Sequence, residues 1–77
     1  MRTSETITYR NLSVEIASDA IYMTAYDSEG QIRGTVERPH MGHGGWQAYT
    51  TDGQAVAMGF QIGPRTSLKK LWEKING

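Results

Sequence analysis

The chain has no cysteine among its 77 residues. Thiol catalysis, disulfide bridges and cysteine-ligated metal centres are therefore excluded, and the absence of bridges is typical of a reducing cytoplasm. The sequence also lacks any run close to the roughly 20 apolar residues of a membrane span, and its N-terminus lacks the apolar region of a signal peptide. From these absences we expect a soluble, cytoplasmic protein that does not engage a membrane.

Net charge is lacking too, because eight lysines and arginines balance eight aspartates and glutamates. Nonspecific DNA binders depend on a strong positive charge, so the composition does not favour that function. The charges are nevertheless uneven, since residues 1–38 carry four basic and six acidic groups and residues 39–77 carry four basic and two acidic groups. So short a chain predicts a single domain, residues 1–77, with a small core that a homodimer would help to stabilise.

Three segments between residues 12 and 36 alternate apolar and polar side chains, separated by turn signals at 17–20 and 27–30. Folding the chain at these turns places Leu12 opposite Ala25 and Met23 opposite Gly34, in a three-stranded antiparallel meander. A slip of one residue would turn every side chain to the other face, so the pattern specifies the architecture well. The expected apolar face consists of Leu12, Val14, Ile16, Ile21, Met23, Ala25, Ile32, Gly34 and Val36.

The flanking segments complete the expected sheet. Residues 1–10 alternate only briefly and predict either a frayed tail or a short edge strand that extends the first strand, of which we favour the strand, and 39–45 form a glycine-rich loop. Segments 46–51 and 54–62 flank Asp52-Gly53, which predicts a type I′ hairpin with Trp46 opposite Gly59. Both faces of this hairpin are partly apolar, so alternation leaves open which one is buried.

A helix is expected at the C-terminus, after Gly63-Pro64, with Thr66 or Ser67 as its N-cap. Its apolar stripe has the spacing i, i+3, i+4, i+7 that packs on one side of a helix. The stripe consists of Leu68, Leu71, Trp72 and Ile75. The predicted fold is α+β: an antiparallel sheet of about five strands, made of a three-stranded meander plus a hairpin, with one C-terminal helix packed on it.

No group of residues predicts catalysis. His40 and His43 have the spacing His-x-x-His, but no carboxylate lies between Arg38 and Thr51 to complete a metal site. The glycine-rich loop leads into a hairpin instead of the helix that a phosphate-binding loop needs. Asp27 is expected to bond turn amides. We therefore expect a protein that is not an enzyme and has no cofactor or metal, and a metal-dependent enzyme using both histidines is only the third hypothesis.

The second face of the meander is the most suggestive feature. Tyrosine and arginine are the side chains that most often anchor protein interfaces, and the expected register directs several outward. The leading hypothesis is a small non-enzymatic protein-binding module, such as a phage or mobile-element accessory protein that inhibits or regulates a host complex. Its expected partner-binding residues are Tyr22, Thr24, Tyr26, Arg33 and Thr35.

The alternative is a nucleic-acid-binding module that uses the sheet face and the basic C-terminal helix. Arginines and lysines on both elements would then contact phosphates, and binding would weaken steeply with salt. The residues assigned to this role are Arg33, Arg38, Arg65, Lys69 and Lys70.

Overall fold

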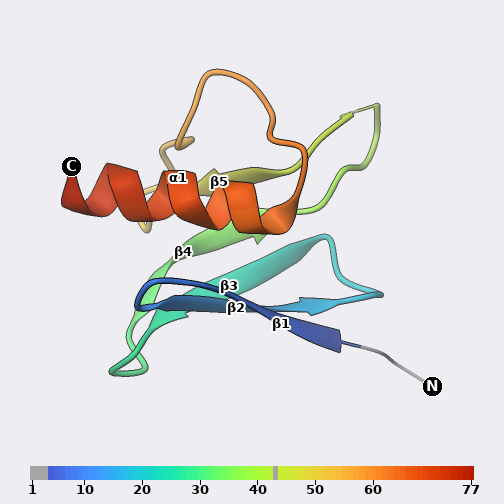
Figure 1. Cartoon of the computed structure of the whole chain (residues 1–77). Helices are drawn as coiled ribbons and strands as arrows, with labels where there is room; N and C mark the ends of the chain where they lie inside the picture. Colours follow the sequence, from blue (N-terminus) through green and yellow to red (C-terminus); the bar gives the residue numbers. More distant parts are fainter. Residues whose placement is uncertain (1–3, 43) are drawn as a thin grey trace.

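The fold is a five-stranded antiparallel sheet followed by one helix, seen in a computed structural model that describes residues 4–42 and 44–77 (Figure 1). The strands follow one another in the sheet in chain order. Their bounds are β1 Ser4–Tyr9, β2 Leu12–Ala17, β3 Tyr22–Asp27, β4 Ile32–Glu37 and β5 Gln47–Tyr49, and the helix is α1 Pro64–Asn76. The α+β class expected from the sequence is confirmed. In the described part of the chain, no helix has the length and apolar character that crossing a membrane requires.

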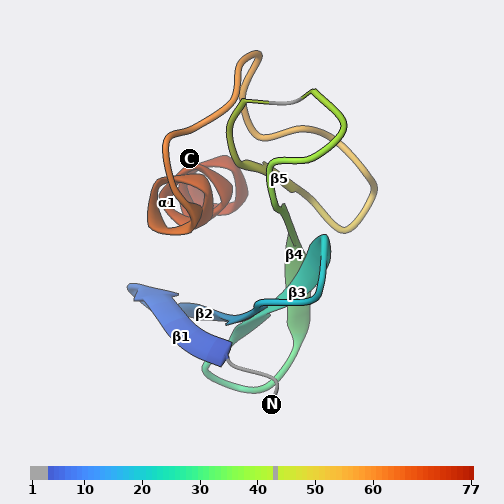
Figure 2. The ribbon, with the colours of Figure 1, turned by 90° about the vertical axis from the view of Figure 1, so that its right-hand side faces the viewer.

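The sheet curls around the helix, so that α1 lies within its concave side (Figure 2). Helix α1 contacts β1, β2, β4 and β5. Leu68 and Leu71 are fully buried there, and Trp72 and Ile75 are half-buried, as the helical spacing predicts. The buried side chains that meet these leucines come from β2 to β5: Leu12, Val14, Met23, Ala25, Val36 and Ala48.

Gly34 is what allows α1 to lie so close to the sheet. A Cβ atom at this position would stand 2.4 Å from the backbone oxygen of Tyr49 and 2.9 Å from Cδ2 of Leu71. The first neighbour is a backbone oxygen and cannot turn away, so only glycine fits without displacing β5.

The predicted registers of the meander are wrong by two residues. Val14 lies opposite Ala25, and Ala25 lies opposite Gly34. Side chains repeat every two residues along a strand, so this shift keeps nearly all of them on the predicted face. It does change neighbours: Tyr22, expected opposite Thr35, lies opposite Glu37.

Two isoleucines leave the predicted apolar face. The register shifts between Ala25 and Tyr26, as at a β-bulge, and Ile32 lies opposite Tyr26 on the outer side of the sheet. Ile32 is 58% exposed, and Ile21, in the turn before β3, is 42% exposed. A bulge adds one residue to one strand and reverses the facing of the residues beyond it, which alternation alone does not reveal.

The hairpin after residue 46 differs from the expectation in both turn and strands. Thr50 and Gln54 are joined by a backbone hydrogen bond across a three-residue loop in which only Gly53 has positive φ, so the turn is not type I′. Trp46 pairs with Gln61, not with Gly59, and the second arm is not a strand. The sheet reaches five strands because β1 pairs with β2 at the opposite edge, so residues 4–9 form a separate strand and not an extension of the next one.

The helix begins earlier than predicted. Gly63 is its N-cap and makes no side-chain cap, and Pro64 occupies the first turn, where a missing amide hydrogen costs nothing. Ser67, one of the two expected caps, is fully buried within the helix, and its hydroxyl donates to Gln61 Oε1 or to the Gly63 carbonyl.

Candidate interaction surfaces

The outer side of the sheet carries the tyrosines singled out by the sequence. Tyr22 is 58% exposed and Tyr26 is 43% exposed, and both project from β3 away from α1. At about 3.3 Å per residue the two lie roughly 13 Å apart along the strand. Thr24 and Thr35 face each other between them. We call this surface the tyrosine face, consisting of Tyr22, Thr24, Tyr26, Ile32 and Thr35.

A hollow of about 520 Å³ opens beside the tyrosine face. It forms where β2 and β3 part: their pairing ends at Val14 and Ala25, whereas β2 stays paired with β1 as far as Ala17. Its lining is about half apolar, from Val14, Ala17, Ala20 and Met23, and half polar, with Glu15 as the one carboxylate among hydroxyl groups. The polar lining residues are Thr6, Ser13, Glu15, Tyr22, Thr24 and Tyr26.

Arg38 joins the two strands at the far end of the hollow. Its Nε donates to the Ala20 carbonyl over 2.8 Å, and its Nη2 donates to the Ala17 carbonyl. The guanidinium also lies 5.2 Å from the centre of the Trp46 ring. These three contacts commit Arg38 to the fold, which argues against its predicted role as a phosphate contact.

Glu37 is buried, although it lies opposite the exposed Tyr22. Only 4% of this residue is exposed. The Tyr49 hydroxyl donates to Glu37 Oε1 over 2.5 Å, and His40 Nε2 lies 2.5 Å from Oε2. The His40 ring in turn meets the Tyr22 ring edge to face, with centroids 6.0 Å apart. Glu37, Tyr49 and His40 therefore form a hydrogen-bonded network that contacts Tyr22 at one end of the tyrosine face.

The network has clear electrostatic consequences. Burial raises the pKa of Glu37, but hydrogen bonds from Tyr49 and His40 outweigh it and hold this pKa below its usual value. The hydrogen bond to Glu37 raises the pKa of Tyr49 to about 12. The charge of Glu37 also raises the pKa of Tyr22. Both hydroxyls thus stay protonated near neutral pH and remain hydrogen-bond donors.

Sequence reasoning missed this network, although part of its signal was present. Tyr49 faces Thr35 across β4 and β5, which makes it a diagonal neighbour of Glu37 on the same face. That pairing was not predicted, because the alternation pattern does not show which strand lies beside β4. As for the His-x-x-His hypothesis, His40 contacts Glu37, and His43 lies outside the described residues.

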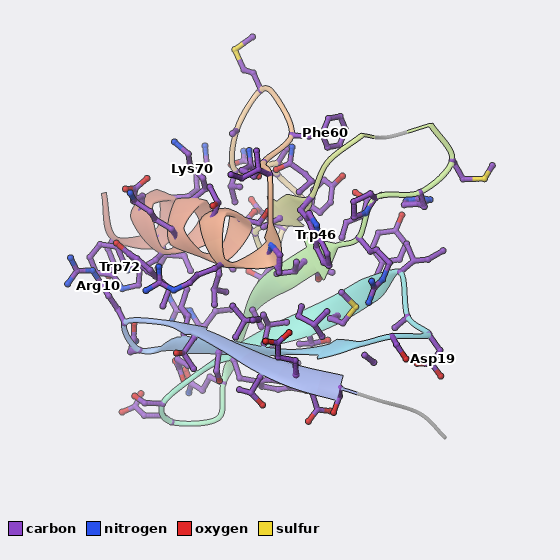
Figure 3. The ribbon with its side chains drawn as sticks, turned by 45° about the vertical axis from the view of Figure 1, so that its right-hand side comes forward. Arg10, Asp19, Trp46, Phe60, Lys70 and Trp72 are labelled. Atoms are coloured by element: carbon purple, nitrogen blue, oxygen red, sulfur yellow. The ribbon has the colours of Figure 1, made fainter. Side chains whose placement is uncertain are left out.

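A second surface lies where β1 meets α1, and we call it the basic edge. Arg65, Lys69 and Trp72 follow one flank of the helix at i, i+4, i+7. Arg10, in the turn after β1, places its Cζ 4.6 Å from the Trp72 ring centre, and Arg65 Cζ lies 5.4 Å from the ring centre of Tyr9. Figure 3 shows Arg10 beside Trp72, and Lys70 pointing away from both. The basic edge consists of Tyr9, Arg10, Arg65, Lys69 and Trp72.

The five residues of the nucleic-acid alternative do not form one surface. Arg33 lies at the β3–β4 bulge, 3.6 Å from Asp27, whose other oxygen accepts the turn amides of Glu29 and Gln31 as predicted. Arg38 donates its hydrogen bonds to the turn between β2 and β3. Lys70 lies on the other flank of α1. Of the five, only Arg65 and Lys69 share a surface. The nucleic-acid alternative therefore stays a prediction, and the positions of its residues support it less well than the tyrosine face supports protein binding.

Comparison with known proteins gave no match: no protein-family model fits the chain, and no curated protein or solved structure is significantly similar to it.

Proposed function

We propose that this protein is a small non-enzymatic protein-binding module and that the tyrosine face is its contact surface. One observation carries the proposal: two exposed tyrosines stand on one strand of the sheet, and both line a hollow whose other polar groups are hydroxyls and the carboxylate of Glu15. Tyrosine gives a large, rigid contact area at low entropic cost, and small hydroxyl side chains supply adaptable hydrogen bonds.

Rigidity of the support strengthens this proposal. Strand β3 is paired with β2 and β4, its inward residues Met23 and Ala25 are buried, and Tyr22 is braced by His40. A surface ordered before binding loses little conformational entropy in the complex. The tyrosines therefore fit the role of interface anchors better than tyrosines on a loop would.

The chemistry of the hollow points to the kind of partner. Its one carboxylate, Glu15, is exposed, and its other polar groups are uncharged hydroxyls. Charged groups across an interface are arranged to be complementary. We therefore expect a partner protein that inserts a lysine or arginine beside Glu15 while its apolar groups cover Tyr26 and Ile32. A phage or mobile-element origin rests on size and composition alone and stays a prediction.

The test is the double variant Tyr22→Ser/Tyr26→Ser, immobilised beside the unchanged protein in extracts of the native host. Proteins retained by the unchanged chain are identified by mass spectrometry, and binding of the purified partner is then measured by calorimetry. Loss of two anchors of this type should weaken binding by at least about 30-fold, the cost of a typical hot spot. Glu15→Gln should weaken it less.

The matched control is Met58→Ser/Ile62→Ser, which removes two fully exposed apolar side chains outside the tyrosine face. We expect this control to bind like the unchanged protein. Equal affinity of the tyrosine variant and the unchanged chain for every partner would show that the tyrosine face is not the contact surface.

A further inference from the structure

The two edges of the sheet are treated differently by the fold. At the β5 edge, the segment after the turn covers the strand: Ala55 pairs with Tyr49, the Val56 amide donates to Ala48, and Gln61 pairs with Trp46. At the other edge, β1 pairs with β2 alone among the described residues. One edge is closed by the chain itself, and the other is open.

The open edge carries little of the usual protection. Alternate residues of an antiparallel strand bond to its neighbour, so about half of the amides and carbonyls of β1 are directed away from β2. Natural edge strands are usually blocked by proline, by charged side chains such as lysine, or by a bulge. The six residues of β1, Ser-Glu-Thr-Ile-Thr-Tyr, include one charge, Glu5, and neither proline nor lysine, and their register with β2 is unbroken. The edge is thus able to accept a further strand.

The charges around the open edge indicate what kind of strand it accepts. Arg10 and Arg65 lie against the ring of Tyr9 at one end of β1, and Lys69 follows one turn after Arg65 on the same flank of the helix. The charged residue of β1 itself is Glu5, near its other end. A second copy of this chain, paired antiparallel through its own β1, would direct that single carboxylate toward the three cations, whereas an acidic segment offers them several carboxylates.

We propose that β1 binds an extended acidic segment of a partner protein by strand addition, with its carboxylates against Arg10, Arg65 and Lys69. Backbone hydrogen bonds to β1 provide the affinity, and the basic edge provides the preference for acidic sequences. This surface is separate from the tyrosine face, so the two proposals stand or fall independently.

The test uses NMR titration of the full chain with a short synthetic peptide of alternating valine and glutamate. We expect amide shifts at residues 4–10 and along the Arg65 flank of α1, together with slower hydrogen exchange in β1. The same peptide N-methylated on alternate amides, or with lysine in place of glutamate, should produce neither effect. Equal shifts with the lysine peptide, or no shifts with the acidic one, would overturn the proposal.

Two charge-reversed variants make a matched pair, because the residues are neighbours, exposed and chemically identical. Lys69→Glu should weaken peptide binding by about two- to five-fold, the effect of one exposed ion pair. Lys70→Glu, on the other flank, should leave it unchanged. Equal weakening by both would indicate attraction by net charge and overturn the assigned site. Binding of oligothymidylate in place of the peptide, or dimerisation in a dilution series, would assign the edge to another occupant.

Discussion

The two sides of the sheet differ in how much of their side chains is exposed to solvent. On the concave side, side chains from β2 to β5 pack against Leu68 and Leu71 and are almost completely removed from water. On the outer side, Tyr22, Tyr26 and Ile32 are each more than 40% exposed. Alternating strands supply both sides from the same segments, so the core and the tyrosine face constrain each other residue by residue. The comparison teaches that one set of strands supplies both a side that stabilises the fold and a side whose large side chains stay accessible to solvent.

The largest effect is expected where the concave side is most tightly packed. Leu71→Ala should lower the free energy of unfolding by about 2–5 kcal/mol, because a buried leucine leaves both lost transfer energy and a cavity. Ile62→Ala is the control, since Ile62 is 96% exposed, and it should change the free energy by less than about 0.5 kcal/mol. Urea denaturation of both variants measures the difference. Similar losses would contradict the contrast between the two environments.

A smaller loss is expected from filling the space between the sheet and the helix. Gly34→Ala should lower the free energy of unfolding by about 3 kcal/mol, since the new methyl group meets the Tyr49 carbonyl. Gly59→Ala adds the same group where nothing lies within 4 Å of it, and should be tolerated. Thermal denaturation followed by circular dichroism compares the two. If Gly34→Ala were tolerated, β5 and α1 would have to be able to move away from β4 at little cost.

The smallest effect links the outer side to the network beneath it. Tyr49→Phe removes a hydrogen bond to a buried carboxylate and should cost about 2 kcal/mol at neutral pH. The folded chain raises the pKa of Tyr49 from 10.0 to about 12, so this contribution is complete below pH 10 and is lost as the pH rises toward 12. Denaturation of the two proteins from pH 8 to 12 should show their difference shrinking. A difference that is constant with pH would disprove the coupling, and Tyr26→Phe serves as the control.

Much of the fold followed from local patterns. The helical stripe, the alternation from Leu12 to Val36 and the turn bonds of Asp27 are all short-range signals, and each is confirmed apart from the two isoleucines that turn outward. The registers were not predicted, because competing pairings two residues apart satisfy the same alternation. The bulge beside Ile32 and the absence of a strand after β5 were not predicted either, because alternation alone does not show where a strand pairing is interrupted. The tyrosine face survived these errors because a shift by two does not change the side on which a residue projects.

By itself, the sequence determined which side chains of the helix and, apart from Ile21 and Ile32, of the meander face the core, because strand and helix periods are set by backbone geometry. Only the tertiary structure decided that Glu37 is buried between Tyr49 and His40, that Arg38 bonds the Ala17 and Ala20 carbonyls, and that Arg10 and Arg65 both lie against the Tyr9 ring. These groupings join residues from different parts of the chain. Contacts of that kind depend on how the sheet curls around α1, which no local pattern specifies.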